Sequence, residues 1–448
     1  MRLKRGSHGV RIAAAMIATV SLVACSGPGG NAPAADTMPT DVRTDVGEDA
    51  ATITLFTAAG LKDYQQGLAD AFMEEHPAIE VELQVEADNN YNTVAPRLLA
   101  SDDPPDLAIV PDLTGAVRDG LVTDLDAYDE AYGWSEKVPA SVLDAGRVED
   151  GAIGTGSLYV GGGAAGPLVG VFYNRELADK VGMTKIPANL DELEDVMAKA
   201  KSTGVTPIVA SNADGLIGHL YNLLLGDYLG SKSVLDVVWR KPGASLDTPE
   251  AVEATARLQE WAKAGYFNED ANAINQDASY GRFASGEGLF MFQGSWMTQA
   301  LPASFDGEYG VFPMPPLEEG DPAVSMTANT LAYSIASRSD EKNAAALFLD
   351  FLTSPEAAAV AAENGYPAAG VAGAEEVSLE ADAETQIQAG YSAIAASNGF
   401  FSWIQNSVPA VNTDLPTQLQ LLVSDKTTPE DAVGHLQEAY QGGLQETS

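Results

Sequence analysis

The sequence predicts an α/β fold that is built from more than one domain. Between residues 52 and 110, short β-prone runs alternate with segments of helical periodicity, in the order strand, helix, strand, helix, strand. This alternation is typical of a sheet whose strands are joined by right-handed helical crossovers. The length of 448 residues suggests two or three domains, and a hydrophobic fraction of 45% is sufficient for a real core.

Periodicity identifies each element in the first part of the chain. Tyr64, Leu68 and Phe72 recur four residues apart, which predicts one face of a helix. Apolar residues alternate with acidic ones from residue 79 to 85, which predicts a strand with one solvent-facing side. The expected elements are a strand at 52–56, a helix at 63–75, a strand at 79–85, a helix at 91–100 and a strand at 107–110 that ends at Pro111-Asp112.

The alternation resumes around a glycine-rich stretch at residues 154–170. Seven of its seventeen residues are glycine, but it matches neither of the glycine motifs that bind nucleotides, so a phosphate-binding loop is not expected. The elements expected next are a strand at 168–173, a helix at 187–204 and a strand at 206–210. Three later helix starts share a hydroxyl cap, a proline and an acid, at residues 248–250, 354–356 and 428–430.

The stretch from residue 280 to 301 is the most informative part of the chain. Glycines flank the apolar run 288–292, which predicts a buried strand. Gly294 would let the backbone turn sharply, and Ser295 could then cap a helix that begins at Trp296. An indole at the end of a strand would lie where open α/β sheets bind ligands, although a core position for Trp296 is the alternative.

The first 25 residues predict a secretion signal. Four basic residues precede an apolar run at 12–24 that is too short to span a bilayer comfortably. The run ends in Leu-Val-Ala-Cys, which is similar to the bacterial lipobox and implies cleavage before Cys25 and lipidation of its thiol. A chance cysteine in a plain signal peptide is the alternative. Residues 26–50 are rich in Gly, Pro, Ala and Asp, so a flexible tether is expected there.

Composition excludes several classes of function. A net charge of −40 argues against nucleic-acid binding, which requires a basic footprint. Cys25 is the single cysteine, and none of the four histidines has zinc-ligand spacing, so neither a metal nor another cofactor is expected. The sequence contains no G-x-S-x-G or S-x-x-K motif, and no catalytic residue is predicted. With 64 acidic residues, the spacing of any two carboxylates is uninformative about glycosidase activity.

Four motifs together resemble the sugar-type extracellular solute-binding proteins of ATP-driven importers. They are F-x-x-G-x-x-x-F-x-x-x-G-S-W at 283–296, P-P-D-L-A-I-V-P-D at 104–112, Y-N-R-E-L at 173–177, and the segment from Ser337 through S-P-E at 354–356. The resemblance covers roughly residues 52 to 448. It implies a two-lobed, periplasmic-binding-protein-like α/β fold, in which each lobe is a mixed sheet flanked by helices and the ligand cleft lies at the hinge.

The resemblance also implies a division of the chain. Residues 1–24 would be the lipoprotein signal peptide, and residues 25–50 the lipidated cysteine and tether. The first lobe would comprise residues 51–165 and 303–352, and the second lobe residues 166–302 and 353–448. In this arrangement the glycines of the 154–170 stretch would give the first crossing between the lobes its freedom to rotate.

The implied function is that of a monomeric lipoprotein that captures a carbohydrate, an oligosaccharide, and delivers it to the permease of an ATP-binding-cassette importer. Trp296 would stack on a sugar ring, since the C–H faces of sugars are apolar while their hydroxyls need polar partners. The residues expected at the ligand site are Trp296, Asp112, Asn212, Asn329, Trp403, Asn412 and Tyr64. Asp112 could instead cap the helix that follows it, and Trp403 could instead fill the core of the second lobe.

Three other functions are compatible with the residues. The first is binding of a non-sugar solute such as a polyol phosphate, a polyamine or a peptide; an anionic ligand would need Arg or Lys in the cleft, whereas a cationic ligand would suit the acidic composition. The second is a secreted lipoprotein hydrolase, which would release product from an oligosaccharide. The third is a structural surface lipoprotein, which would bind no small solute.

Overall fold

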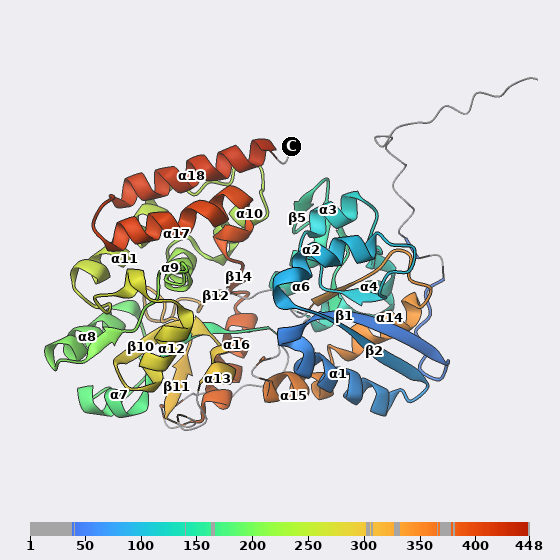
Figure 1. The fold of residues 1–448 in the computed structure, drawn as a ribbon, viewed down its shortest axis with the longest axis horizontal. Helices are drawn as coiled ribbons and strands as arrows, with labels where there is room; N and C mark the ends of the chain where they lie inside the picture. Colours follow the sequence, from blue (N-terminus) through green and yellow to red (C-terminus); the bar gives the residue numbers. More distant parts are fainter. Residues whose placement is uncertain are drawn as a thin grey trace, which may run out of the picture. The chain divides into compact units, whose positions relative to one another are not determined.

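The computed structural model describes residues 38–39, 41–138, 140–162, 166–301, 305, 308–326, 332–364, 366–367, 378–379 and 381–446. Most of this chain is organised around two mixed β-sheets, each with its own helices (Figure 1). The α/β fold class that the sequence predicts is therefore confirmed, and the two sheets correspond to two lobes.

The first sheet has the strand order β2-β1-β3-β13-β7. Its strands are β1 (Ala51–Ala58), β2 (Ile79–Glu86), β3 (Leu107–Ala108), β7 (Gly161–Gly162) and β13 (Ala332–Ile335). The strand β1 pairs in parallel with β2 and with β3, placing Leu55 opposite Leu107. The strand β13 is antiparallel to both of its neighbours, so a segment some 220 residues away in sequence completes the sheet.

Helices and a small hairpin sheet accompany the first sheet. The helices are α1 (Lys62–Glu75), α2 (Asp88–Leu99), α3 (Leu113–Arg118), α4 (Asp126–Tyr132), α5 (Trp134–Lys137), α6 (Ala140–Leu143), α14 (Lys342–Phe351) and α15 (Pro355–Glu363). The small sheet consists of β4 (Arg147–Glu149), β5 (Ala152–Ile153) and β6 (Ser157–Leu158). As its spacing predicts, α1 turns Tyr64, Leu68 and Phe72 into the core, each at most 5% exposed.

The second sheet has the strand order β11-β8-β10-β9. Its strands are β8 (Val169–Asn174), β9 (Thr206–Ile208), β10 (Gly288–Gly294) and β11 (Tyr309–Phe312). Every residue of β8 and β10 is buried, which explains why both strands are continuously apolar in sequence rather than alternating. The strand β10 is antiparallel to β8 and parallel to β9.

The helices around the second sheet come from both halves of the chain. They are α7 (Arg175–Val181), α8 (Leu190–Ser202), α9 (Gly218–Leu229), α10 (Ser231–Val238), α11 (Pro249–Lys263), α12 (Gln276–Ala284), α13 (Met297–Ala300), α16 (Ala383–Ala396), α17 (Pro409–Val423) and α18 (Pro429–Glu446). The helices α17 and α18 lie side by side (Figure 1). The helix α11 contacts both of them, and α9 contacts α11 and α17. The short strands β12 (Ser325–Met326) and β14 (Phe400–Phe401) form a separate parallel pair.

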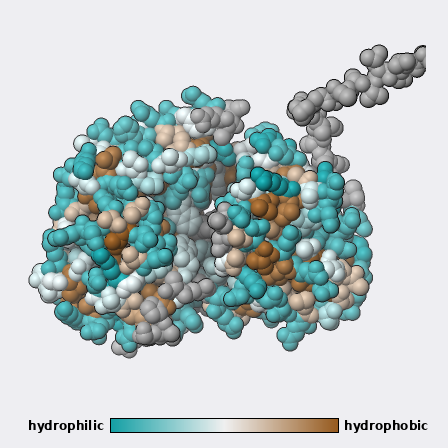
Figure 2. Space-filling model, in the orientation of Figure 1, coloured by the Kyte–Doolittle hydropathy of each residue, from teal (hydrophilic) through white to brown (hydrophobic). Residues whose placement is uncertain are grey.

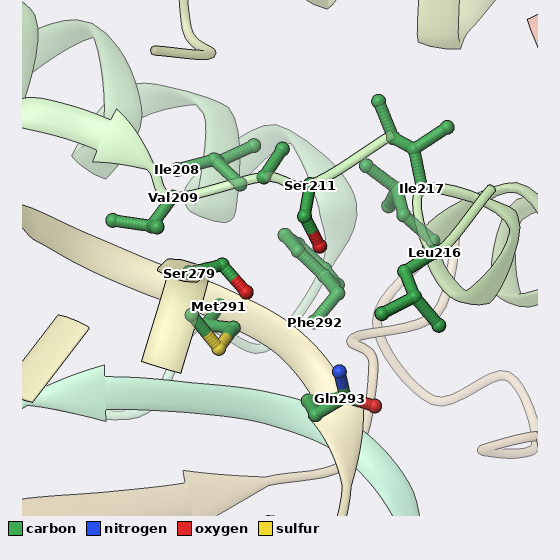
Figure 3. Close-up of a pocket in the computed structure, with 11 residues that line it drawn as sticks. Ile208, Val209, Ser211, Leu216, Ile217, Ser279, Met291, Phe292 and Gln293 are labelled. Atoms are coloured by element: carbon green, nitrogen blue, oxygen red, sulfur yellow. The ribbon is translucent and has the colours of Figure 1, made fainter. Parts of the chain in front are cut away.

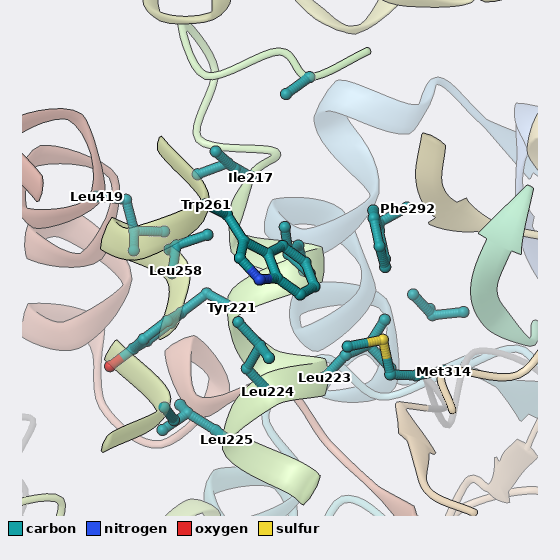
Figure 4. Packing of buried hydrophobic residues seen from close by; sticks show 14 of the residues in the cluster. Ile217, Tyr221, Leu223, Leu224, Leu225, Leu258, Trp261, Phe292, Met314 and Leu419 are labelled. Atoms are coloured by element: carbon teal, nitrogen blue, oxygen red, sulfur yellow. The ribbon is translucent and has the colours of Figure 1, made fainter. Parts of the chain in front are cut away.

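The core of the second lobe is centred on Trp261 of α11. Its indole is 1% exposed and is surrounded by apolar side chains from α9, α11, α17 and β10 (Figure 4). The indole N–H donates a 2.6 Å hydrogen bond to Glu194 Oε1, and Arg257 pairs with the same oxygen at 2.7 Å. The polar edge of this large side chain is therefore satisfied within the lobe, as burial of an indole requires.

The three helix starts with one local design are confirmed. The hydroxyl groups of Thr248, Ser354 and Thr428 accept from the amides of Ala251, Ala357 and Asp431, at 3.2, 3.1 and 3.1 Å respectively. Each hydroxyl satisfies one of the first-turn amides that lack a partner within the helix.

Two segments differ from the division expected from the sequence. The strand β11 at residues 309–312 pairs with β8 in the second sheet, although the boundary at residue 303 placed it in the first lobe. The helix α15 contacts α1 beside the first sheet, although residues from 353 onward were assigned to the second lobe. In both cases the pairing partner is more than 100 residues away, so local sequence gave no signal of it.

The tether expected at residues 26–50 is wrong for its final part. Val46 is 4% exposed and belongs to the core of the first lobe. Arg43 N donates to Asn343 Oδ1 at 3.0 Å, and Asn343 Nδ2 donates to the carbonyl of Asp41 at 3.1 Å. One buried valine and the amide of Asn343 thus fix residues 41–50 against α14 despite their polar composition.

The surface of the described residues is mainly hydrophilic on the face shown in Figure 2, with hydrophobic residues in patches. Among the residues that the structure describes, Met38 and Val85 are the exposed large hydrophobic side chains, at 58% and 42%. In the same part of the chain, no single helix is long and apolar enough to cross a membrane. The helices α14 and α15 reach that length and composition only together, and they are bent by 70°.

Candidate ligand-binding site

Trp296 lies directly beyond β10, between that strand and α13. It is partly buried and packs against the core of the second lobe. The neighbouring Ser295 is fully buried, its amide donates to the Leu168 carbonyl at 2.8 Å, and its Oγ accepts from the Leu168 amide at 3.2 Å. The sequence predicted that Ser295 caps the following helix, and this prediction is wrong. It ties the end of β10 to the start of β8 and so fixes the backbone that carries the indole.

Gly294 is required by the position of the indole. A Cβ atom at residue 294 would overlap the Cζ3, Cη2 and Cε3 atoms of Trp296, so the ring lies back over the glycine. Gly294 belongs to β10 and has no positive φ, so its backbone conformation does not require glycine. Glycine is required there because it has no side chain. In the motif Gly-Ser-Trp, the glycine leaves space for the indole, the serine fixes the backbone, and the tryptophan supplies the ring.

Replacing Gly294 with alanine is expected to lower the free energy of unfolding by about 1–3 kcal/mol, because the added methyl group displaces the indole or the strand. Chemical denaturation measures the loss, and a change in tryptophan fluorescence of the folded protein reports the displaced ring. Gly281 is the matched control, since it lies in α12 and a Cβ there would meet no atom within 4 Å. Gly281→Ala should leave stability unchanged or raise it, and equal effects of the two substitutions would contradict the steric role of Gly294.

Trp296 belongs to a group of three aromatic rings, here called the tryptophan cluster: Trp296, Trp403 and His219. The His219 ring meets the Trp296 ring edge-on at 5.6 Å and the Trp403 ring at 6.2 Å, and the two indoles are 6.5 Å apart. Trp403 follows β14, and His219 lies in the first turn of α9. Three segments that are distant in sequence therefore place their rings together.

Asn222 holds the segment that carries Trp403. This fully buried side chain accepts from the amide of Ile404 at 2.9 Å and donates to the Gly218 carbonyl at 2.8 Å and to Gln405 Oε1 at 3.2 Å. Because Gly218 precedes His219, one amide group fixes the backbones beside two members of the cluster. A buried amide with three hydrogen bonds makes this arrangement rigid.

Polar groups border the tryptophan cluster on the side of α12. Burial raises the pKa of Tyr280, while hydrogen bonds with Gln276 and with the Trp296 indole lower it. The Gln276 side chain donates to the Tyr280 hydroxyl, and the exposed carboxylate of Asp214, which is bonded to the Gln276 backbone, raises the pKa of both Tyr280 and His219. Its Oδ2 atom accepts from the amide of Gln276 at 2.7 Å. The site thus combines indoles with a phenol, an imidazole and a carboxylate.

His219 is neutral at pH 7. Burial lowers its pKa to about 4, against the opposing effects of a hydrogen bond with the Gln293 side chain and of Asp214. The ring is 8% exposed, and among the described residues its Nδ1 atom has no hydrogen-bond partner. A neutral imidazole in contact with two indoles can donate to or accept from a ligand hydroxyl without adding charge.

The stability of the protein should reflect this lowered pKa. Between about pH 6.5 and pH 4 the unfolded chain protonates this histidine and the folded chain does not, so the contribution is present above the unfolded pKa and is lost as the pH falls. On moving from pH 7 to pH 4.5, the wild type should therefore lose about 2 kcal/mol more than His219→Gln does. Urea unfolding of both proteins at the two pH values measures this difference. Parallel losses would show that His219 protonates equally in both states.

A hollow of about 20 Å³ lies beside the cluster, under Gln293. In Figure 3 the hydroxyl groups of Ser211 and Ser279 and the amide of Gln293 surround this space from three different elements. The volume is sufficient for one water molecule and far too small for a sugar ring. The hollow is therefore not the position of a solute.

The comparison of sequences identifies the family. The family model described as "Bacterial extracellular solute-binding protein" matches residues 58–359 of the chain. The chain belongs to this family. Its members are solute receptors rather than enzymes, and they act outside the cytoplasm. The family that the motifs suggested is thereby confirmed. No curated protein matches the chain.

Solved structures of this solute-binding fold are similar over nearly the whole chain. A chitin oligosaccharide binding protein is 20% identical with a TM-score of 0.64, covering 89% of this chain and 100% of that chain. RafE from Streptococcus pneumoniae in complex with raffinose is 20% identical with a TM-score of 0.62, covering 87% and 99%. The GacH receptor of Streptomyces glaucescens GLA.O, solved unliganded and with acarbose, is 20% identical with a TM-score of 0.62, covering 89% and 100%. At these identities the likeness establishes the fold.

Of the ligand residues expected from the sequence, the structure of this family member brings Trp296 and Trp403 together. Asp112 is exposed and caps α3, since its Oδ1 accepts from Gly115 N and from Thr114 Oγ1, each at 3.0 Å. Asn412 is exposed on α17. Asp112 thus has the capping role that was the alternative.

Two further residues of the expected set are structural. Asn212 is fully buried and donates to Asn272 Oδ1 at 2.7 Å, while its carbonyl accepts from Gln420 at 2.7 Å, so it joins the loop after β9 to α17. Tyr64 is 5% exposed and packs against Tyr366 at 5.0 Å in the core of the first lobe. Asn329 and Cys25 lie outside the described residues.

Sequence reasoning missed three residues of the site: His219, Tyr280 and Asp214. Asp214 follows the strand expected at 206–210 by four residues, and Tyr280 began the informative 280–301 stretch, so both had a local signal. His219 had none, because a lone histidine in an apolar helix is normally a core residue. Its importance is visible only when the packed lobe brings it into contact with both Trp296 and Trp403.

Proposed function

We propose that this protein is a receptor that captures a carbohydrate, an oligosaccharide, and delivers it to the permease subunits of an ATP-driven importer. The observation that carries the proposal is the tryptophan cluster at the end of β10, bordered by Tyr280 and Asp214. The face of a sugar ring is apolar and packs on an indole, while its rim of hydroxyls needs acceptors and donors. The cluster offers both within one small region.

The structural relatives support the solute class. Three of them bind chitin oligosaccharide, raffinose and acarbose, respectively. These three ligands are all oligosaccharides or resemble one, although the proteins share only 20% identity with this chain. A carbohydrate is therefore the first class of solute to be tested here.

Capture is proposed to occur by closure of the two lobes on the solute. The chain passes from the first sheet to the second between β7 and β8, and returns between β11 and β13, so a few connecting segments could absorb the rotation. Closure would remove water from the solute and strengthen its hydrogen bonds. A solute that binds the closed state better than the open one shifts the population, and this shift would be the signal to the permease.

Secretion and anchoring are proposed from residues 1–25 alone. The apolar run and Cys25 would direct cleavage and lipidation, and the acyl chains would hold the receptor at the outer face of the cell membrane. Partition of the full-length product into a detergent phase, with mass spectrometry of its N-terminal peptide, tests the anchor. An N-terminal peptide that starts at residue 25 without added lipid mass would contradict it.

A thermal-shift screen tests the solute class. The chain from residue 26 onward, which retains the packed residues 41–50, is heated with mono- and oligosaccharides, polyols, polyamines and peptides. A ligand present at about 100 times its dissociation constant adds about 2.7 kcal/mol of stability, which gives a readily measured shift. A shift with oligosaccharides only supports the proposal, and shifts confined to other solutes would overturn it.

A cationic solute is the second candidate. Asp214 acts on His219 and Tyr280, which both contact Trp296, and a carboxylate near an aromatic face also suits an ammonium group. Polyamines in the same screen separate the two candidates. Their binding should weaken strongly with added salt, whereas that of a neutral sugar should not.

A further inference from the structure

The acidic residue beside the tryptophan cluster is held in a fixed position. Asp214 lies in the loop between β9 and α9, and its Oδ2 atom accepts from the first amide of α12, that of Gln276, at 2.7 Å. The amide of the preceding residue, Ala213, donates to the Ile274 carbonyl at 3.2 Å, and Gly215 follows with a φ of +79°. Two hydrogen bonds and the turn at Gly215 thus hold the exposed carboxylate of Asp214 in a fixed position.

The charge of Asp214 acts on the groups that would face the solute. It raises the pKa of His219, whose ring contacts Trp296, and that of Tyr280, which accepts a hydrogen bond from the Trp296 indole. The second charge that acts on Tyr280 is also negative, from Asp277. Both rings remain uncharged at pH 7, because burial lowers the pKa of His219 and raises that of Tyr280. The net charge presented to a solute there is therefore negative.

The nearest cation on α12 does not offset this charge. Arg282 donates to both carboxylate oxygens of Asp270, at 2.7 and 2.6 Å, and also lies 3.7 Å from Glu287. The hydrogen bond from Arg282 lowers the pKa of Asp270 to about 2, which shows how fully the guanidinium is engaged. A bidentate pair of this kind leaves little of the positive charge for a solute.

We propose that Asp214 is a specificity-determining residue, which makes the site select uncharged oligosaccharides and reject those that carry carboxylates, such as uronic acid units. The inference rests on the proposed carbohydrate function. A solute carboxylate beside Asp214 would meet a like charge, and Arg282, the cation of α12, is already engaged by Asp270, whereas a hydroxyl there can donate to the carboxylate. The tryptophan faces do not distinguish the two sugars, so the discrimination depends on the negative charge there, of which Asp214 is the part that acts on both His219 and Tyr280.

Calorimetric titration of the chain from residue 26 onward tests the inference. The probes are the neutral oligosaccharide that gives the largest shift in the thermal screen, and the same oligosaccharide with its primary hydroxyls oxidised to carboxylates. The wild type is expected to bind the oxidised form about tenfold or more weakly, and the ratio should fall with added salt. In Asp214→Asn, which keeps an acceptor for the Gln276 amide, the ratio of the two affinities should shrink by about tenfold, because the like charge is removed for the oxidised sugar while the neutral sugar loses only the charged character of its hydrogen bond.

The matched control is Asp191→Asn, an exposed acid in the first turn of α8 that does not act on His219 or Tyr280. It should leave the ratio as in the wild type. Equal affinities of the wild type for the two sugars, or an unchanged ratio in Asp214→Asn, would overturn the inference while leaving the carbohydrate function intact. Absence of binding by either sugar would overturn the proposed function and this inference with it.

Discussion

Trp296→Ala should weaken binding of the oligosaccharide found in the screen by about 30-fold or more. Truncation of a tryptophan at the centre of a binding site typically costs 2 kcal/mol or more, and each 1.4 kcal/mol is a factor of ten in affinity. The loss combines the missing apolar platform with the release of Tyr280 and His219 from their contacts with the indole. Calorimetric titration of the variant beside the wild type measures it.

The partial substitution separates stacking from structure. Trp296→Phe keeps an aromatic face but loses the indole N–H that interacts with Tyr280, so it should recover part of the affinity. Chemical denaturation of both variants shows whether the second lobe remains folded. If Trp296→Ala is folded and binds as tightly as the wild type, the indole has a packing role, and the proposed position of the solute is wrong.

Trp261→Ala should give the largest loss of stability, about 3–5 kcal/mol of unfolding free energy. The indole is 1% exposed, packs against Phe292 at 6.1 Å and is enclosed by apolar side chains (Figure 4). Its removal leaves a large cavity, and Glu194 loses the 2.6 Å hydrogen bond from the indole. Urea denaturation, analysed by linear extrapolation, measures the change.

The replacement Trp261→Phe should cost distinctly less than the alanine variant. It fills much of the volume, and Arg257 still pairs with Glu194 at 2.7 Å, so the carboxylate is not left without a partner. A loss below about 1 kcal/mol in Trp261→Ala would contradict a core that is rigidly packed around this ring.

Local order was predictable from the sequence. The caps at Thr248, Ser354 and Thr428 depend on atoms three residues apart, and the buried strand at 288–292 is bounded by its own glycines. The same locality explains the error at Ser295: its hydroxyl was assigned to the next helix, whereas its partner is Leu168, 127 residues away. The sequence shows which groups can donate and accept, but it does not show which distant groups form a hydrogen bond.

The ligand site shows the same limit. Trp296 and Trp403 were predicted as candidates, and Asp112 was left open between capping and binding, but nothing in the sequence indicated that His219 would contact both indoles. Its three rings come from residues 219, 296 and 403, on elements that meet only through packing of the second lobe.

The sequence by itself determined the α/β class, the family and the helix starts, and it indicated the two tryptophans as candidate ligand residues. These features depend on periodicity, on short motifs and on contacts within one turn. The tertiary structure alone decided that β11 joins β8, that Asn212 and Tyr64 are buried, and that His219 and Tyr280 both contact Trp296 while Asp214 acts on both of them. The physical reason is that burial and long-range pairing are properties of the whole packed chain: the same aspartate or tyrosine is a cap, a support or a ligand group according to which distant element lies against it.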